Sequence, residues 1–315
     1  MPEQIEVAPS AIEATYKARE VEGVIDVYFY RKIGFRIAHW FAQRNVGPTA
    51  VTLLGGVFGI VAGHLYYYRD LGTNIVGMAL HVWANALDNA DGQLARLTGR
   101  GSRNGRIIDS LVDHLIFLNI YVHLALRCLR DGAPATVCLL ALVAGISHAL
   151  QGAAADYYRH AYLHFVGVRT QAQFDSTALL RSRYRELEWR RQPWNKFLLA
   201  LYLNFTWQQE MLAPKLNKLR EVLDQLYPRE LPEWLKARYA ASARRMFKWW
   251  GFLMTNTRMI VLFLVLFLGR PVWYFWIELT VLNVLLIVLL FHQNKMSESL
   301  LKLATGARDQ IGIRS

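Results

Sequence analysis

The sequence predicts an all-α membrane protein with six transmembrane helices, an N-terminal interfacial amphipathic helix and a cytoplasmic helical insert. Three observations support this fold class. Of the 315 residues, 54% are hydrophobic and 19% are charged, which is too apolar for an ordinary soluble domain. Several apolar stretches reach the length of about 20 residues that a helix needs to cross a bilayer. One long polar segment, 168–245, separates the earlier apolar stretches from the later ones.

The N-terminal segment, 1–45, is expected to be cytoplasmic or interfacial. Its first 22 residues are polar and do not resemble a cleavable signal peptide. Within 24–44 an apolar stripe recurs every four residues beside basic side chains, which is typical of a helix that lies in the membrane interface. A helix of a soluble subdomain is the alternative. The stripe consists of Ile25, Phe29, Ile33, Ile37 and Phe41.

The first four transmembrane helices are expected within 46–167. The segments are 47–67, 73–95, 106–128 and 134–155. The first contains no Asp, Glu, Lys or Arg, and the fourth begins at Pro134, a residue suited to a first helical turn. The second and third segments are apolar but contain several carboxylates. The prediction of six transmembrane helices counts both of these segments as spans.

The rest of the chain divides into three parts. Residues 168–245 form the expected cytoplasmic helical insert, in which Leu216, Leu219, Leu223 and Leu226 share one helix face. Transmembrane helices five and six are expected within 246–292, at 246–268 and 272–291. Residues 293–315 are the expected cytoplasmic tail.

The net charge of +12 is compatible with a nucleic acid or an anionic membrane surface. The apolar stretches favour the membrane, and no nucleic-acid partner is expected. Basic residues concentrate in the N-terminal segment, the 96–106 loop and the tail. The positive-inside rule therefore predicts that both termini and this loop face the cytoplasm, in a cell (inner) membrane.

Four aspartates stand out in the second and third predicted helices. Asp88 and Asp91 are three positions apart, and Asp109 and Asp113 are four apart, so each pair lies on one helix face. A carboxylate at the centre of a bilayer costs about 2.5–3.5 kcal/mol, and mutual repulsion adds to this cost. Hard divalent cations, Mg²⁺ or Mn²⁺, would compensate the charge, and two such ions can act on a phosphoryl group together. An ion-pair network with neighbouring arginines is the structural alternative.

The residues between the aspartates suit a phosphate-bearing ligand. Gly92 and Gly105 lack side chains, so a nucleotide could approach the backbone closely. Ala95 also leaves room, and the planar guanidinium of Arg96 can bind a phosphate. An ion-coupled transporter is the rival class, since acidic residues in spans also mark ion paths.

The region 88–113 resembles the signature of the CDP-alcohol phosphatidyltransferase family, Asp-x2-Asp-Gly-x2-Ala-Arg-x8-Gly-x3-Asp-x3-Asp. It agrees at every fixed position: Asp88, Asp91, Gly92, Ala95, Arg96, Gly105, Asp109 and Asp113. Family members often carry Pro-Asn-x-x-Thr at the start of the first span. This chain has Pro48 and Thr52 there, but Thr49 replaces the asparagine, which puts that nucleotide contact in doubt.

The resemblance implies a phospholipid-synthesising enzyme that moves a phosphoalcohol group from a CDP-alcohol to an acceptor hydroxyl and releases CMP. It implies two metal ions bound by the four aspartates, Asp113 as general base, and substrate contacts at Gly92, Arg96 and Ser102. The expected donor is CDP-diacylglycerol, with inositol, inositol phosphate or a related polyol as acceptor. A choline or ethanolamine phosphotransferase with a lipid acceptor is the alternative. The resemblance also implies a homodimer.

Three further residues are candidates for acceptor binding. Arg258 lies too deep in its predicted span to be an anchor at the nearer end, so it either reaches toward the cytoplasmic end or binds an anionic acceptor. Tyr158 and Arg159 follow the fourth span. They either line the acceptor pocket or belong to an aromatic and basic belt at the membrane interface.

Overall fold

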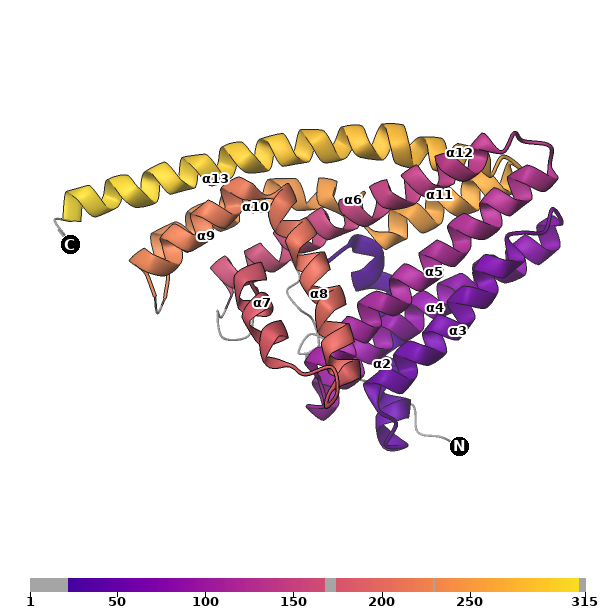
Figure 1. The fold of residues 1–315 in the computed structure, drawn as a ribbon, viewed down its shortest axis with the longest axis horizontal. Helices are drawn as coiled ribbons and strands as arrows, with labels where there is room; N and C mark the ends of the chain where they lie inside the picture. The colour runs from indigo at the N-terminus through magenta and orange to yellow at the C-terminus, as the bar shows by residue number, and fades with distance from the viewer. Residues whose placement is uncertain (1–21, 168–173, 229, 312–315) are drawn as a thin grey trace. The chain divides into compact units, whose positions relative to one another are not determined.

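The computed structural model describes residues 22–167, 174–228 and 230–311. The described residues form helices and no strand, which confirms the all-α prediction. Figure 1 labels the helices. Their bounds are η2 Asp26–Tyr30, α2 Arg31–Gln43, α3 Pro48–Leu65, α4 Leu71–Thr98, α5 Arg103–Arg130, α6 Thr136–Val166, α7 Thr177–Glu186, α8 Pro193–Leu212, α9 Pro214–Leu226, α10 Glu233–Gly251, α11 Thr255–Phe267, α12 Val272–Ile277, η3 Glu278–Leu282 and α13 Asn283–Ile311.

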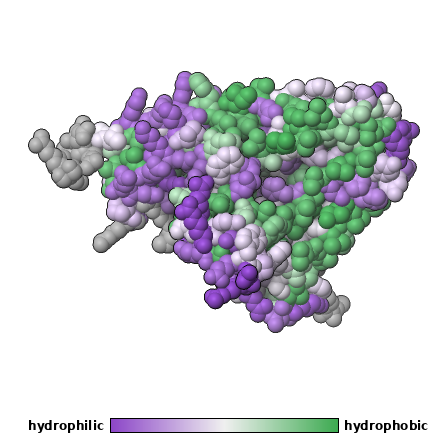
Figure 2. All heavy atoms as spheres, in the orientation of Figure 1, coloured by the Kyte–Doolittle hydropathy of each residue, from purple (hydrophilic) through white to green (hydrophobic). Residues whose placement is uncertain are grey.

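Five helical stretches in the described part of the chain are long and apolar enough to cross a membrane. They are Pro48–Leu65, Arg103–Arg130, Thr136–Val166, Glu233–Phe267 and Val272–Gly306. Helix α4, the second predicted span, is not among them, because Asn74, His81, Asn85 and its aspartates lower its apolar character. The membrane character is thus supported, and the sixth span stays a prediction. Figure 2 shows extended hydrophobic areas on the visible face, as lipid contact requires.

The chain forms two compact units. Unit 1 runs to Ile146 and includes Met259–Trp276, and unit 2 holds Ser147–Arg258 and the chain from Ile277 onward. The four aspartates of the sequence motif all belong to unit 1. The insert belongs to unit 2, where its described residues form α7, α8, α9 and most of α10.

Close packing of α3 on its neighbours determines the geometry of unit 1. Glycines line the face of α3 that meets α5: a Cβ on Gly56 would lie 2.8 Å from Val112 Cγ1, and one on Gly59 would lie 2.5 Å from Ile116 Cδ1. Gly55, on an adjacent face, lies against Leu87 of α4. Small residues of this kind let helix backbones approach closely in a membrane, where packing drives helix association.

Helix α2 packs against α4 rather than standing apart from the bundle. A Cβ on Gly34 would lie 3.2 Å from the backbone nitrogen of Ala90, so the two helices nearly touch there. Ala38 is fully buried, and Ile37 and Phe41 of the predicted stripe pack on the same core. The amphipathic helix therefore exists, and the C-terminal part of its stripe is used for packing within unit 1.

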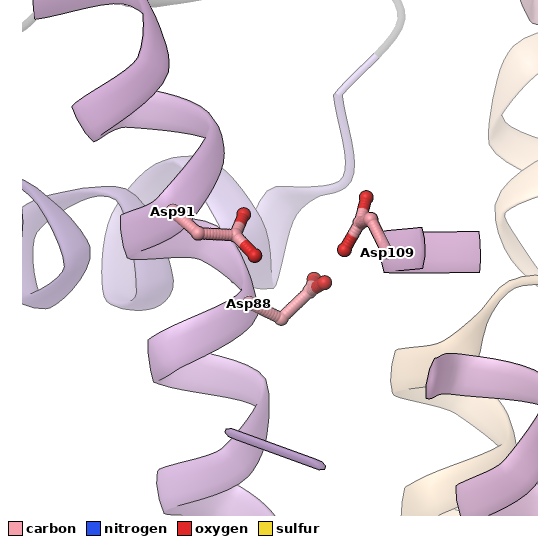
Figure 3. Close-up of side chains that lie close together, drawn as sticks. All are labelled: Asp88, Asp91 and Asp109. Carbon is pink, nitrogen blue, oxygen red and sulfur yellow. The ribbon is translucent and has the colours of Figure 1, made fainter. Parts of the chain in front are cut away.

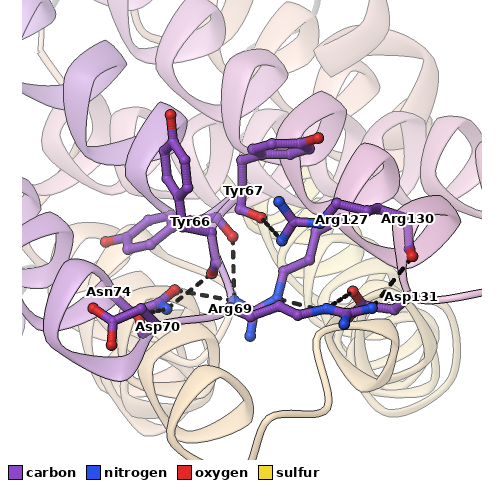
Figure 4. Close-up of polar contacts among 9 residues, drawn as sticks. Tyr66, Tyr67, Arg69, Asp70, Asn74, Arg127, Arg130 and Asp131 are labelled. Atoms are coloured by element: carbon purple, nitrogen blue, oxygen red, sulfur yellow. Dashed lines mark hydrogen bonds and ion pairs between the residues drawn. The ribbon is translucent and has the colours of Figure 1, made fainter.

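Arginines at the end of unit 1 remote from the four aspartates bind helix C-termini (Figure 4). Arg127 is buried and donates to the Tyr66 carbonyl oxygen at 3.2 Å, while Arg130 donates to the Tyr67 carbonyl oxygen at 2.8 Å. Arg69 pairs with Asp131. The negative end of a helix dipole, at the C-terminus, stabilises a cation placed there. The three arginines therefore hold the ends of α3 and α5 together.

The same end also fixes the start of α4. The Asp70 carboxylate caps this helix by accepting a hydrogen bond from the Thr73 backbone N–H at 2.7 Å. That bond lowers the pKa of the Asp70 carboxyl, because it favours the charged form.

Replacement of Gly59 by alanine should destabilise the protein. The new methyl group would overlap Ile116, and such overpacking typically costs about 1–3 kcal/mol. We expect a lower midpoint of thermal unfolding in detergent. The matched control is Gly152→Ala in α6, where nothing lies within 4 Å of the new Cβ and the substitution should be neutral or stabilising. Equal midpoints for the two variants would contradict the role given to α3 packing.

Candidate functional site

Three carboxylates converge between α4 and α5. Asp88 and Asp91 of α4 and Asp109 of α5 each offer an oxygen atom, and these atoms lie within 4.8 Å of one another. Figure 3 shows the three side chains pointing toward one space. A tight turn at 99–102 connects the two helices, and Gly99 ends α4 with a left-handed φ of 66° that favours glycine. The structure thus brings together three of the four predicted metal ligands.

Asp113, the fourth predicted ligand, lies one helical turn beyond Asp109 on α5 and is not part of the group of three. It is nevertheless within electrostatic range of Asp88 and Asp91. The site therefore contains four mutually repelling carboxylates on two helices.

The donor set of this site fits a hard divalent cation. One carboxylate oxygen of Asp109, Oδ1, is buried and has no hydrogen-bond partner in the described chain. A buried acceptor without a partner costs free energy, and like charges nearby increase that cost. An oxygen-binding cation such as Mg²⁺ or Mn²⁺ would satisfy the atom and neutralise the cluster.

Thr52 of α3 contacts a predicted metal ligand directly. Its hydroxyl hydrogen-bonds to the Asp91 carboxylate, and both side chains are buried. The hydroxyl is also 3.2 Å from the carbonyl oxygen of Pro48, the first residue of α3. The resemblance assigns Pro48 and Thr52 to substrate binding. The contact with Asp91 gives Thr52 a second role, because a partner of this kind orients a metal-binding carboxylate.

Gly92 and Arg96 lie together on α4. The two terminal nitrogens of Arg96 are 3.6 Å from the position that a Cβ on Gly92 would occupy. The guanidinium therefore extends back over the glycine, one turn from Asp91, where it can meet a phosphate. Ala95 is half-buried beside the connecting turn, 3.9 Å from the Cβ position of Gly101.

Ser102 and Gly105 form the start of α5. The Ser102 side chain accepts a hydrogen bond from the Gly105 backbone N–H at 2.9 Å, which makes it the N-cap of the helix. Thr49, the residue that departs from the family pattern, places its hydroxyl 3.6 Å from the Cβ position of Gly105. Thr49 thus borders the glycine that the sequence predicts to face a nucleotide.

A second layer around α4 was not predicted from the sequence. Gln93 is fully buried and donates to the Arg31 backbone oxygen of α2 at 3.1 Å. Arg31 in turn binds Glu22 through two hydrogen bonds of 2.9 Å and 2.8 Å. The Gln93 contact fixes α2 against the motif helix, and the bonds to Glu22 hold the Arg31 side chain within the N-terminal segment. Gln93 occupies a variable position of the signature, so the motif gave no signal for it.

Arg258, a predicted acceptor contact, is buried in unit 2 within a polar network. It donates to Glu278 at 3.1 Å, to Gln151 at 2.6 Å and to the Leu253 carbonyl oxygen. Only 2% of Arg258 is exposed. Protein groups already occupy its guanidinium, which is the arrangement of a structural ion pair, and acceptor binding stays a prediction.

Tyr158 and Arg159, the other predicted acceptor contacts, lie on α6 in unit 2. Tyr158 stacks on Trp250 with ring centroids 4.9 Å apart, and its hydroxyl is buried without a hydrogen-bond partner in the described chain. Arg159 pairs with Asp156 at 2.6 Å. Both keep unused hydrogen-bonding capacity, since Arg159 Nε also lacks a partner there. Their role toward an acceptor stays a prediction.

Comparisons with known proteins cover the region that contains this site. The family model described as CDP-alcohol phosphatidyltransferase matches residues 45–202. A phosphatidylinositol phosphate synthase from Streptomyces avermitilis is 30% identical over 116 residues, which cover 36% of this chain and 46% of that protein. An archaetidylinositol phosphate synthase from Pyrococcus horikoshii is 33% identical over 91 residues, 29% of this chain and 47% of that protein. The matches thus span about half the length of these curated relatives.

Removal of the Thr52 hydroxyl should weaken metal binding at the aspartates. Thr52→Val keeps the side-chain shape but removes the hydrogen bond to Asp91, and loss of such a partner typically costs about 10- to 100-fold in metal affinity. We expect this loss in a Mn²⁺ titration followed by electron paramagnetic resonance. The matched control is Thr305→Val, which removes a hydroxyl bonded only to backbone carbonyls of α13. Unchanged Mn²⁺ affinity in Thr52→Val would refute the positioning role.

Proposed function

Because this chain belongs to the CDP-alcohol phosphatidyltransferase family, we propose that it is an integral membrane enzyme of phospholipid synthesis. It transfers a phosphatidyl group from a CDP-alcohol to an acceptor hydroxyl and releases CMP. One observation carries the proposal: three of the four aspartates of the family signature converge on one space, with a glycine and an arginine of the same signature beside them. This is an arrangement suited to a pyrophosphate.

Asp88, Asp91, Asp109 and Asp113 would hold two divalent ions, Mg²⁺ or Mn²⁺. When bound, such ions supply positive charge that neutralises a pyrophosphate and stabilises CMP as the leaving group. The convergence of three carboxylates and the unpartnered oxygen of Asp109 support this assignment.

The other residues of the signature bind and orient the substrates. The Arg96 guanidinium binds a phosphate of the donor, and the bare backbone at Gly92 and Gly105 admits the nucleotide. Ala95, Ser102, Pro48 and Thr52 complete the donor site. Asp113 accepts the proton of the acceptor hydroxyl, whose oxygen then attacks the phosphorus that bears the lipid alcohol. Aspartate is a weak base for a hydroxyl, so positioning must supply much of the acceleration.

The relatives narrow the choice of substrates. Their names share inositol phosphate and differ in the lipid part, phosphatidyl in one and archaetidyl in the other. We therefore favour inositol phosphate as the acceptor over free inositol, and CDP-diacylglycerol as the donor. A CDP-choline or CDP-ethanolamine donor with a lipid acceptor is the alternative.

The distribution of basic residues supports a placement of the enzyme in the membrane, and the family resemblance supports an assembly. The basic residues of the N-terminal segment, the turn between α4 and α5 and the tail support a cytoplasmic site and cytoplasmic termini in the cell (inner) membrane. A homodimer is the assembly that the family resemblance favours.

Purified protein in lipid nanodiscs should release CMP from CDP-diacylglycerol when Mg²⁺ or Mn²⁺ and inositol phosphate are both present. We expect no release without metal or acceptor, and a loss of at least about 100-fold in Asp113→Asn, the lower range for a positioned general base. Asp131→Asn removes a carboxylate at the opposite end of the site's helix and should stay active. Release from CDP-choline with diacylglycerol instead would reverse the assignment of donor and acceptor. Absence of release from either pair would reject the proposed activity.

Gly92→Ala should lower CMP release without lowering stability. The nearest atoms to the new methyl group are 3.6 Å away, so the protein itself has room for it. Alanine in place of glycine inside a helix should even stabilise by about 0.5–1 kcal/mol. The methyl group would instead occupy space needed by the nucleotide, which should raise KM for the donor. A variant with wild-type KM would show that the substrate does not approach this part of α4.

A further inference from the structure

Helix α8 of the insert exposes several large apolar side chains. Its exposed residues include Trp194, Phe197, Trp207 and Met211, with exposed fractions of 56%, 41%, 49% and 52%. Phe197, Asn204 and Met211 are seven positions apart and therefore share a face, with the two tryptophans beside it. Leu198, Leu199, Thr206 and Gln209 are buried on the other side of the helix. Apolar side chains thus lie on both sides of α8, and large apolar side chains on the exposed side are not the pattern of a helix that faces water.

The neighbouring helix α9 has the ordinary pattern. It buries Leu216, Leu219 and Leu223 and exposes Lys218 and Glu221. The two helices belong to the same unit and follow one another directly in the chain, so the difference between them is local. The exposed face of α9 is polar and suits contact with water. The exposed face of α8 is largely apolar and suits contact with an apolar phase.

Unit 2 holds α8 beside the end of a predicted span. Gln209 donates to the Ala153 carbonyl oxygen and to Asp156 of α6, both at 3.3 Å. The apolar part of α6 was predicted to end at 155, where the membrane boundary is expected. In Figure 1 α8 runs across the direction of α6 rather than along it. A helix anchored at that level and crossing a span can lie along the membrane surface.

Basic residues accompany the N-terminal end of α8. Arg181, Arg183 and Arg185 of α7 are exposed, as are Arg190 and Arg191 in the turn before α8. Within 181–191 the acidic residues are Glu186 and Glu188, and Glu188 pairs with Arg191 at 3.2 Å. Trp189, directly before Arg190, is 52% exposed. Exposed tryptophan next to arginine is the composition of a contact with an anionic lipid surface.

We propose that α8 is a second interfacial helix, which lies in the surface of the bilayer that the spanning helices cross. Its apolar face enters the boundary between head groups and acyl chains, and the arginines before it contact anionic head groups. In the described part of the chain, α8 is not among the helices that are long and apolar enough to cross a membrane. The insert is thereby tied to the membrane through its own lipid contact, independently of the activity at the aspartates.

Site-specific quenching in the full-length protein tests this proposal. Trp207→Cys is made in a chain whose Cys128 and Cys138 are replaced by alanine, and the new thiol carries a bimane fluorophore. The protein is placed in nanodiscs of phosphatidylcholine and phosphatidylglycerol, part of which carry a nitroxide on the acyl chain. The matched control is Lys218→Cys on the exposed face of α9, and Asn204→Cys provides a second probe on α8.

We expect quenching at 207 and 204 to be at least about threefold stronger than at 218, because only a helix buried in the interface meets acyl chains. It should weaken when phosphatidylglycerol is omitted. Equally weak quenching at 207, 204 and 218 would overturn the proposal. Efficient cross-linking of two copies through 207, without quenching by lipid, would assign the face to a second copy of the chain and would also overturn it.

Discussion

The mutual repulsion of the four aspartates is the constraint on which the arrangement of unit 1 depends. Carboxylates this close are stable together only if a cation or tightly placed donors compensate them. The fold meets that demand with rigid surroundings. The glycine face of α3 lets it approach α5 closely, Thr52 of α3 reaches Asp91, and α2 is fixed to the motif helix through Gln93. The close packing of four helices therefore serves to hold a charge cluster that would otherwise push them apart.

Unit 2 contains the complementary case, a buried charge that the protein neutralises by itself. Arg258, Glu278 and Gln151 are each at most 2% exposed, and Gln151 extends the network to Asn283 at 2.8 Å. The pair would be strongly destabilising if one partner were removed, because the other would stay buried and charged. Asn283 also donates to the Ser147 hydroxyl of α6 at 3.0 Å. The network thus joins three helical segments within unit 2.

The sequence was sufficient for the all-helical character and for the convergence of three of the four aspartates, because helical spacing and a fixed motif determine both. It did not indicate how α2 is used. The stripe predicted for the interface packs partly on α4, and a period of four residues cannot distinguish a lipid from a protein neighbour. Nor did it give the partners of Arg258 or Thr52, since Glu278 and Asp91 are 20 and 39 positions away from them. Contacts of that kind follow from tertiary packing, which local patterns do not encode.

The arginines at the far end of unit 1 bear on the distribution of basic residues from which the orientation of the chain in the membrane is predicted. In the predicted topology, Arg69, Arg127 and Arg130 lie in or near connections on the side opposite the cytoplasmic loop, so they count against the positive-inside bias. Each of them binds backbone carbonyls at a helix end, or Asp131, or both. In the folded protein each of these charges is therefore matched by backbone carbonyls or by Asp131. Arginines in these connections thus have a use that the positive-inside rule does not consider, because they fasten the ends of neighbouring helices to one another.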